Sequence, residues 1–225
     1  SKLVRDFIFI TEDKNNYMRI FAKKNNILCF DHDPNIGGRF SIFSITSLLP
    51  LISIGYSLPK IIKSFIEAKK LFEKNHRDLS KYTSYSIAYE KKFDLNILVG
   101  LSYHDKINAV NEWYRQIFAE SLGKNKNAKN YISSYGSIDQ HSQFQLYIDG
   151  PYDKHFNFFK IKNNNKTVNS NASLIKGYNL MSTLENGAIK TLQQKKFLVT
   201  QFSIDDDFNS SVSYTHLRAH ETTRH

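Results

Sequence analysis

Cysteine is almost absent from this chain of 225 residues, in which Cys29 is the only one. A single thiol excludes an internal disulfide framework and a cysteine-based metal site. Cys29 stands inside the run ILCF, where we expect it to be a small, buried apolar residue. The cytoplasm is therefore the expected compartment, because disulfide-dependent folds belong to oxidising ones.

Long apolar runs are also absent. The longest, SIFSITSLLPLISIGY, is broken by Ser, Thr and Pro50, so it does not predict a membrane-spanning helix. The opening SKLVRDFIFITED lacks the apolar core and cleavage site of a secretory signal. With 40% hydrophobic and 14% aromatic residues, the composition instead predicts a globular protein of one large or two modest domains.

Positive charge is in excess, with a formal net charge of +10. This excess raises the alternative of a nucleic-acid-binding protein. The basic residues are mostly Lys scattered among Asn, Ile, Phe and Tyr, without an Arg-rich stripe or a basic helix. We favour a solvated basic surface, and expect neither a nucleic-acid nor a membrane partner.

The end of the chain, SVSYTHLRAHETTRH, contains His216 and His220 four residues apart, as two zinc ligands on a helix would be. No apolar periodicity connects the stretch to a core, however, and it resembles a translated sequencing adapter. We therefore predict that residues 210–225 are a non-native tail, and we expect no metal site there.

Strand and helix patterns alternate along the rest of the chain, which predicts the α/β class with parallel strands. Runs of consecutive apolar residues predict buried strands, and apolar residues at helical spacing predict helices. The expected strands are 6–10, 27–30, 95–102, 142–148 and 196–204. The expected helices are 15–25, 57–75, a weaker one at 80–93, 104–124 and 173–194, with a polar connection at 160–173. This order of elements predicts two doubly wound α/β domains joined by helices, of which the first is incomplete.

The stretch IGGRFS (36–41) is the first candidate site. Paired Gly37 and Gly38 allow a tight backbone path and close approach by a ligand, and Arg39 follows where a guanidinium can stabilise an oxyanion. The alternative is a plain loop with a surface Arg.

The stretch NEWYRQIFAESLGK (111–124) is the second. Glu120 lies at the edge of the apolar face that includes Trp113, and in the last turn before Gly123. The helix end and partial burial would both disfavour its ionised form, making it a better proton acceptor. Gln116 lies one turn earlier on the same side. The alternative is a boundary Glu on an ordinary amphipathic helix.

The third candidate is His141 in YGSIDQHSQFQLYIDG (135–150), just before the strand expected at 142–148. Loops at strand ends hold the sites of open α/β sheets, and His can move protons at neutral pH. A hydrogen-bonded structural His is the alternative.

Together, GGRFS, SLLP, WYRQIFAESLGK and QHSQFQLYIDGPYDKHF resemble the glucose-6-phosphate isomerase family in order and spacing, over about residues 5–205. The resemblance implies sugar-isomerase (SIS) folds, which are flavodoxin-like parallel α/β sandwiches. It places the end of a first SIS domain at 1–45, connecting helices at 46–92 and a second SIS domain, truncated, at 93–209.

The resemblance also implies roles. Glu120 corresponds to the base that moves a proton between C1 and C2, Arg39 to the group that stabilises the enediolate, and His141 to the residue that assists ring opening. Gln116 and Gly38 match substrate-binding positions. No metal or cofactor is implied. The resemblance also implies a homodimer in which each site receives His141 from the partner subunit.

The chain departs from the family pattern in three places. Ser137 and Ile138 follow Gly136 where the family usually has Gly-Pro-Thr. The family's phosphate-binding loop would lie before Ser1, and its catalytic Lys would lie beyond residue 209. We therefore expect an internal fragment that is inactive alone. A non-catalytic sugar-phosphate-sensing SIS module is the alternative from another functional class.

Overall fold

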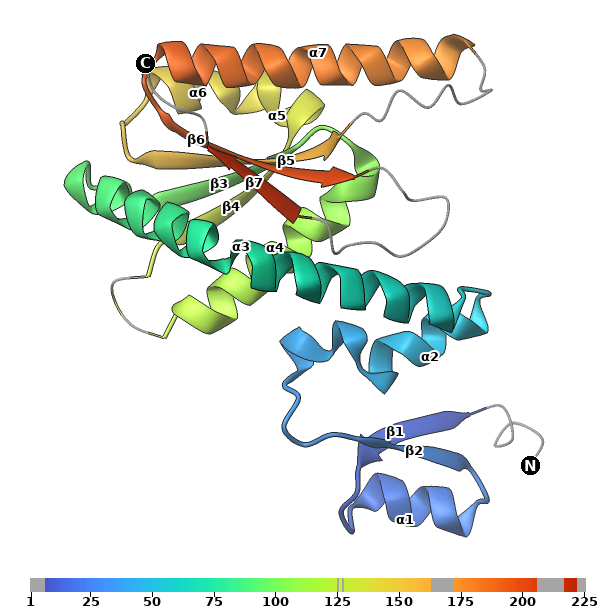
Figure 1. Ribbon diagram of the computed structural model, residues 1–225. Helices are drawn as coiled ribbons and strands as arrows, with labels where there is room; N and C mark the ends of the chain where they lie inside the picture. The colour runs from blue at the N-terminus through green and yellow to red at the C-terminus, as the bar shows by residue number, and fades with distance from the viewer. Residues whose placement is uncertain (1–6, 125, 127, 163–171, 206–216, 222–225) are drawn as a thin grey trace. The chain divides into compact units, whose positions relative to one another are not determined.

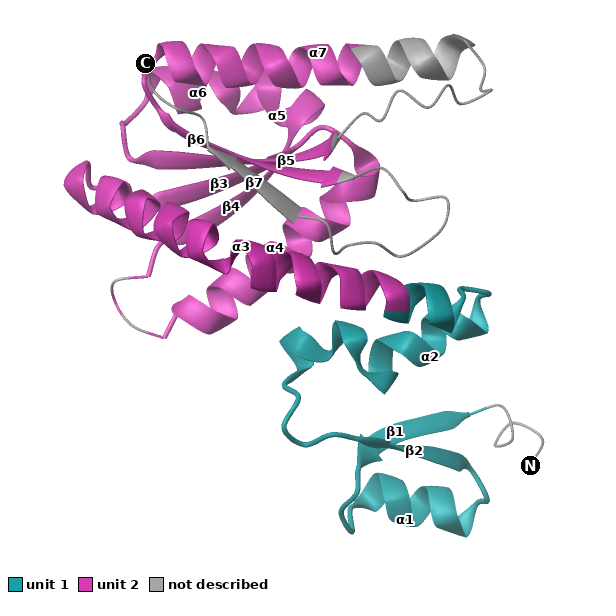
Figure 2. Cartoon of the chain, in the orientation of Figure 1, with its two compact units in different colours: residues 1–62 teal, residues 63–225 magenta. Residues whose placement is uncertain are grey.

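The computed structural model describes residues 7–124, 126, 128–162, 172–205 and 217–221 (Figure 1). The chain divides into two compact units, residues 1–62 and 63–225 (Figure 2). Within the described ranges, no helix has the length and apolar character needed to cross a membrane.

The first unit begins with a β-α-β arrangement, as predicted. Strands β1 (Ile8–Glu12) and β2 (Leu28–His32) pair in parallel, and α1 (Tyr17–Lys24) connects them. Asn16 caps α1 by accepting a hydrogen bond from the backbone N–H of Arg19 at 3.0 Å. The Arg19 guanidinium in turn donates to Asp31 on β2 at 2.6 Å, so the helix is fixed to the strand it precedes.

A short 3₁₀ helix, η2 (Gly38–Phe43), and helix α2 (Ile45–Ser53) follow. Helix α3 (Leu58–Lys92) then starts in the first unit and continues through the chain boundary between the units. The prediction of two helices at 57–75 and 80–93 is therefore wrong in one respect, because the two are one continuous helix. The residues from 76 to 79 carry no Gly or Pro that would end it.

The second unit is built on a sheet with the strand order β4-β3-β5-β6-β7. Its parallel strands are β3 (Ile97–Ser102), β4 (Asn130–Tyr135), β5 (Lys154–Lys162) and β6 (Leu198–Asp205), and β7 (Leu217–Glu221) pairs antiparallel with β6. Numbered from β3, this is the flavodoxin-like order 2-1-3-4-5. The predicted parallel α/β class is confirmed.

Helices cover both faces of this sheet (Figure 1). Helices α3 and α4 (Asp105–Leu122) lie on one face, and α5 (Gly136–Ser142), α6 (Phe144–Asp149) and α7 (Ala172–Gln194) lie on the other. Strand β5 shows the consequence, since its buried residues alternate between the two sides. Phe156 and Phe158 join the cluster beneath α6 and α7, whereas Phe159 and Ile161 pack with α4.

The strand predicted at 142–148 is wrong. The residues form the end of α5 and the start of α6, with Phe144 and Tyr147 buried one helical turn apart. The prediction also missed β4 and β5 altogether, because polar residues interrupt their apolar pattern. Of the polar connection expected at 160–173, residues 160–162 belong to β5, residues 172 and 173 open α7, and 163–171 lie outside the described residues.

Of the predicted tail, only the backbone of β7 lies within the described residues. His216 and His225, which the rejected zinc pattern included, lie outside them. The assignment of 210–225 as non-native stays a prediction.

Candidate active site

Arg39 lies at the start of η2, directly after the paired glycines. Its guanidinium carbon is 5.0 Å from the centre of the Phe40 ring, a cation–π contact. A Cβ added at Gly37 or Gly38 would meet nothing within 4 Å, and neither glycine has a positive φ. The local backbone therefore does not itself require glycine at either position. The open space leaves room for a ligand to approach the backbone.

Glu120 lies in the last turn of α4, which Gly123 caps with an N–H bond to the carbonyl of Ala119 at 2.8 Å. The side-chain amide of Gln116 donates to Glu120 Oε1 at 2.9 Å. Both residues are exposed. The expected partial burial of Glu120 is therefore wrong for this chain, while its predicted pairing with Gln116 on one side of the helix is present.

His141 lies in the last turn of α5 and is exposed. The start of α5 is held by Asp139, which accepts the backbone N–H of Tyr135 at 2.7 Å. Gln140 accepts a hydrogen bond from the Tyr103 hydroxyl at 3.0 Å, which fixes the neighbouring residue to the end of β3. Ile138, which stands in the family's Thr position, is 67% exposed and so contributes little to the core.

The second unit keeps Glu120 and His141 apart. Helix α4 starts at the carboxyl end of β3 and runs back toward the amino ends of the strands, whereas α5 starts at the carboxyl end of β4. Glu120 lies about 22 Å along the axis from the start of α4, at 1.5 Å per residue. Glu120 therefore lies toward the amino ends of the parallel strands, and His141 lies toward their carboxyl ends. Arg39 belongs to the other unit.

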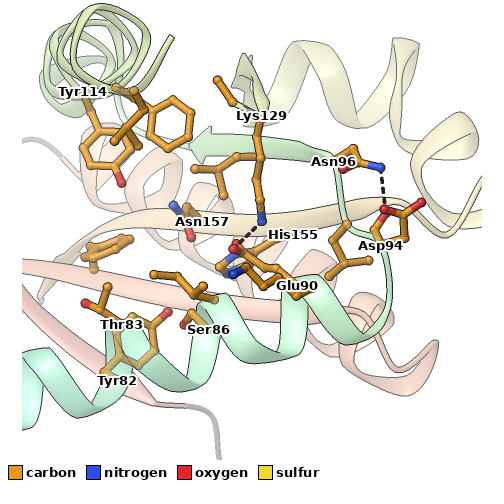
Figure 3. Close-up of a pocket in the computed structure, with 18 of the residues that line it drawn as sticks. Tyr82, Thr83, Ser86, Glu90, Asp94, Asn96, Tyr114, Lys129, His155 and Asn157 are labelled. Carbon is orange, nitrogen blue, oxygen red and sulfur yellow. Dashed lines mark hydrogen bonds and ion pairs between the residues drawn. The ribbon is translucent and has the colours of Figure 1, made fainter. Parts of the chain in front are cut away.

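A polar cluster that the sequence did not predict lies on the α3 side of the sheet (Figure 3). It joins Glu90, Lys129 and His155, which are far apart in sequence, around a cavity of about 850 Å³. The pairing of the strands and the packing of α3 on the sheet bring these residues together, so no local pattern could have indicated them. Among the described residues, no group of three or more His, Cys, Asp or Glu side chains could hold a metal ion.

The strand order and the helices on both faces place the chain among doubly wound parallel α/β proteins. A hypothetical protein from Thermus thermophilus has a similar fold, with a TM-score of 0.71 and 22% identity over 91% of this chain and 52% of that one. No family model matches the chain.

Curated sequences then point to a particular protein. Glucose-6-phosphate isomerase of Campylobacter jejuni is 36% identical over 169 residues, which are 73% of this chain and 41% of the enzyme. That of Methanocaldococcus jannaschii is 38% identical over 146 residues, 63% of the chain and 36% of the enzyme. The resemblance to the glucose-6-phosphate isomerase family is confirmed. The chain spans about two fifths of the length of these relatives.

Proposed function

We propose that the protein to which this chain belongs is a glucose-6-phosphate isomerase, which interconverts glucose 6-phosphate and fructose 6-phosphate in glycolysis and gluconeogenesis. The observation that carries the proposal is the similarity to several enzymes of that name over most of this chain. We propose the cytoplasm as its compartment, which the single cysteine of the chain supports. The reaction moves one proton from C2 to C1 and one from the C2 hydroxyl to the C1 oxygen, all within one substrate, so the chemistry requires no redox cofactor.

In the proposed mechanism, Glu120 accepts the C2 proton of the open-chain aldose and returns it to C1. The hydrogen bond from Gln116 supports this role, because it orients the carboxylate at the open end of α4. Arg39 stabilises the negative charge that develops on the enediolate oxygens, and Gly38 allows the sugar phosphate to approach. A positioned base contributes about 10²–10⁴-fold to such a reaction, and oxyanion stabilisation contributes on the order of 10²–10³-fold.

We propose further that the protein is a homodimer and that His141 assists ring opening in the partner's site. Glu120 and His141 lie toward opposite ends of the strands of one sheet, and this separation supports the arrangement. One copy of the second unit cannot place both side chains on the same sugar, because the sheet and the length of α4 lie between them. A second copy removes this restriction.

The test is Glu120→Gln in the protein encoded by the full reading frame. The amide has nearly the shape of the carboxylate but cannot accept a carbon-bound proton, so we expect turnover to fall by at least about 10³-fold. Steady-state assay of fructose 6-phosphate conversion measures this fall, with KM expected within a few-fold. The matched control is Glu73→Gln on α3, which removes another exposed carboxylate.

Turnover of Glu120→Gln within tenfold of the unaltered protein would remove Glu120 from the base role. The same assay on residues 1–225 and 1–209 should show no activity from either, since each spans only part of the relatives' length. Near-native activity from 1–209 would contradict the fragment interpretation. Activity in 1–225 alone would show that residues 210–225 belong to the enzyme.

A further inference from the structure

The cavity of about 850 Å³ in the second unit lies between α3, the end of α4 and the sheet (Figure 3). Its volume is within the range of small-molecule sites. None of the residues proposed for catalysis or substrate binding is among those that line it. Its chemistry can be derived from its own side chains.

One wall is a chain of hydrogen bonds centred on His155. Glu90 Oε1 lies 2.6 Å from His155 Nδ1, and His155 Nε2 lies 2.7 Å from Thr200 Oγ1. Because an ionised carboxylate only accepts, Nδ1 donates to Glu90, and Nε2 is hydrogen-bonded to the Thr200 hydroxyl. Thr200 Oγ1 is also hydrogen-bonded to the hydroxyl of Tyr82. The polar atoms of this series of hydrogen bonds are paired with one another, so the series holds this wall rigid.

Glu90 and Lys129 form an ion pair in this wall. Burial alone would raise the pKa of Glu90, but hydrogen bonds from His155 and Lys129 outweigh burial and lower it. Glu90 is therefore ionised at neutral pH, and it is ion-paired with Lys129. In the buried part of the lining, Glu90 compensates Lys129, so no cation there is left to pair with a phosphate dianion. The other charged lining residues, Lys91, Asp94 and Lys126, are exposed to solvent. A buried anion without a counter-charge would be strongly disfavoured.

Asn157 places an unsatisfied hydrogen-bond acceptor beside the cavity. It follows His155 by two residues on the same face of β5, is 3% exposed, and lies beside the cavity (Figure 3). Its Oδ1 has no hydrogen-bond partner among the described residues. A buried acceptor without a partner destabilises the folded chain. A ligand hydroxyl that donates to Asn157 would remove this cost.

The opposite wall is aromatic. Tyr114, Phe118 and Phe202 line the cavity, with the Tyr114 ring 6.2 Å from that of Phe118 and 6.4 Å from that of Phe202. Burial raises the pKa of Tyr114 to about 12, so its hydroxyl, which points into the cavity in Figure 3, stays a neutral donor. Ser86 on α3 adds another hydroxyl to the lining.

We propose that this cavity binds an uncharged, polyhydroxylated ring compound of monosaccharide size. The ring packs against the aromatic wall, while its hydroxyls pair with Asn157, Tyr114 and Ser86. The balance of Glu90 against Lys129 selects a neutral ligand over a phosphorylated one.

The test is a titration of the 225-residue chain with methyl β-D-glucopyranoside, followed by saturation-transfer NMR, with glucose 6-phosphate as the charged comparison. The glucoside is locked as a ring, so the proposed isomerase reaction cannot consume it. We expect saturable binding of the glucoside, at least about tenfold tighter than that of glucose 6-phosphate. No saturable binding, or tighter binding of the phosphate, would overturn the proposal.

Two variants locate the binding. Ser86→Trp fills the cavity and should weaken binding at least about tenfold, whereas Ser84→Trp, on the same helix and outside the lining, should leave it within twofold. Asn157→Leu should lose binding without lowering the melting temperature, since it removes an unpaired acceptor. Equal binding by the two Trp variants, or unchanged binding by Asn157→Leu, would place the ligand elsewhere.

Discussion

Glu185 is a buried carboxyl that the proposed mechanism does not use. It is 2% exposed on α7, and its Oε1 has no hydrogen-bond partner among the described residues. Burial raises its pKa to about 7, although Lys160, with Nζ 3.7 Å from Oε2, opposes the rise. The folded protein therefore resists ionisation of Glu185, while the unfolded chain ionises it near its ordinary pKa of 4.5.

We predict that Glu185→Gln removes a pH-dependent loss of stability. Because the folded-state pKa is raised, the free energy of unfolding should fall as pH rises from about 4.5 to about 7, and then stay low. The variant should be more stable than the unaltered chain by about 3 kcal/mol above pH 7, and nearly equal to it below pH 4.5. Urea denaturation from pH 4 to 8 measures the difference. Glu73→Gln is the exposed control, and parallel curves for all three proteins would contradict the prediction.

At the scale of elements, β3 shows why one glycine is required. A Cβ at Gly100 would lie 1.9 Å from the Tyr131 hydroxyl and 2.3 Å from Asn111 Oδ1. These two side chains are hydrogen-bonded to each other at 2.6 Å, and Asn111 donates to the Gly100 carbonyl at 2.9 Å. The glycine thus leaves room against β3 for the hydrogen-bonded pair of Asn111 from α4 and Tyr131 from β4.

We predict that Gly100→Ala destabilises the chain by about 1–3 kcal/mol, because overpacking displaces this hydrogen-bonded pair. Gly187→Ala is the matched control, since a Cβ there meets nothing within 4 Å inside helix α7. The control should stabilise the chain by about 0.5–1 kcal/mol through helix propensity. Thermal unfolding of both variants checks the pair, and a stability gain in Gly100→Ala would be incompatible with the packing described.

Helix α3 is attached to the sheet through an ion pair between two partly buried side chains. Glu90 contacts Lys129 and His155, and the Glu90 and Lys129 side chains are 11% and 22% exposed. We predict that Glu90→Gln costs about 3–5 kcal/mol of unfolding free energy, since it leaves Lys129 without its counter-charge. Glu73→Gln breaks only the surface pair with Lys69 and should cost about 0.5 kcal/mol or less. Equal losses in denaturant titrations of the two variants would show that the pair of Glu90 with Lys129 is not the attachment.

The elements that the sequence predicted are those with a single consistent pattern. Strand β3 is apolar throughout and α4 has one apolar face, so each was recognised. The run from 144 to 148 fits two patterns, because Phe144, Leu146 and Ile148 alternate as in a strand. The structure instead buries Phe144 and Tyr147 and leaves Leu146 56% exposed, which is helical spacing. Tertiary packing decided between periods that the sequence allowed equally.

Local motifs predicted the residues of the candidate site, but they did not predict how those residues are placed in the fold. The pairing of Gln116 with Glu120 follows from a spacing of four residues on a helix. The exposure of Glu120 depends instead on what packs against the end of α4, which no helical pattern contains. The cluster of Glu90, Lys129 and His155 depends on strand order, so it is invisible until the sheet is known.

At the scale of the whole molecule, the two units differ in how much core they contain. Buried apolar residues of the first unit number three, Ala22, Ile27 and Ile61, among the described residues. The second unit contains both extended core clusters, in which Phe156, Phe158 and Phe159 are at most 1% exposed. Each fully buried Phe contributes about 1.5–3 kcal/mol of transfer free energy. Stability should therefore be concentrated in the second unit.

We predict that the first unit opens without the second. Strands β1 and β2 pair in parallel just as β3 and β5 do, so the two pairs share one hydrogen-bond pattern and differ in what covers them. Local opening is easiest where few apolar groups are buried. Hydrogen–deuterium exchange of the 225-residue chain should show the amides of Phe9–Glu12 exchanging at least about 10²-fold faster than those of Leu98–Leu101, with the difference persisting at low urea. Equal protection of the two strand pairs would mean that the chain unfolds as one cooperative body, with the small sheet stabilised by more than its own buried residues.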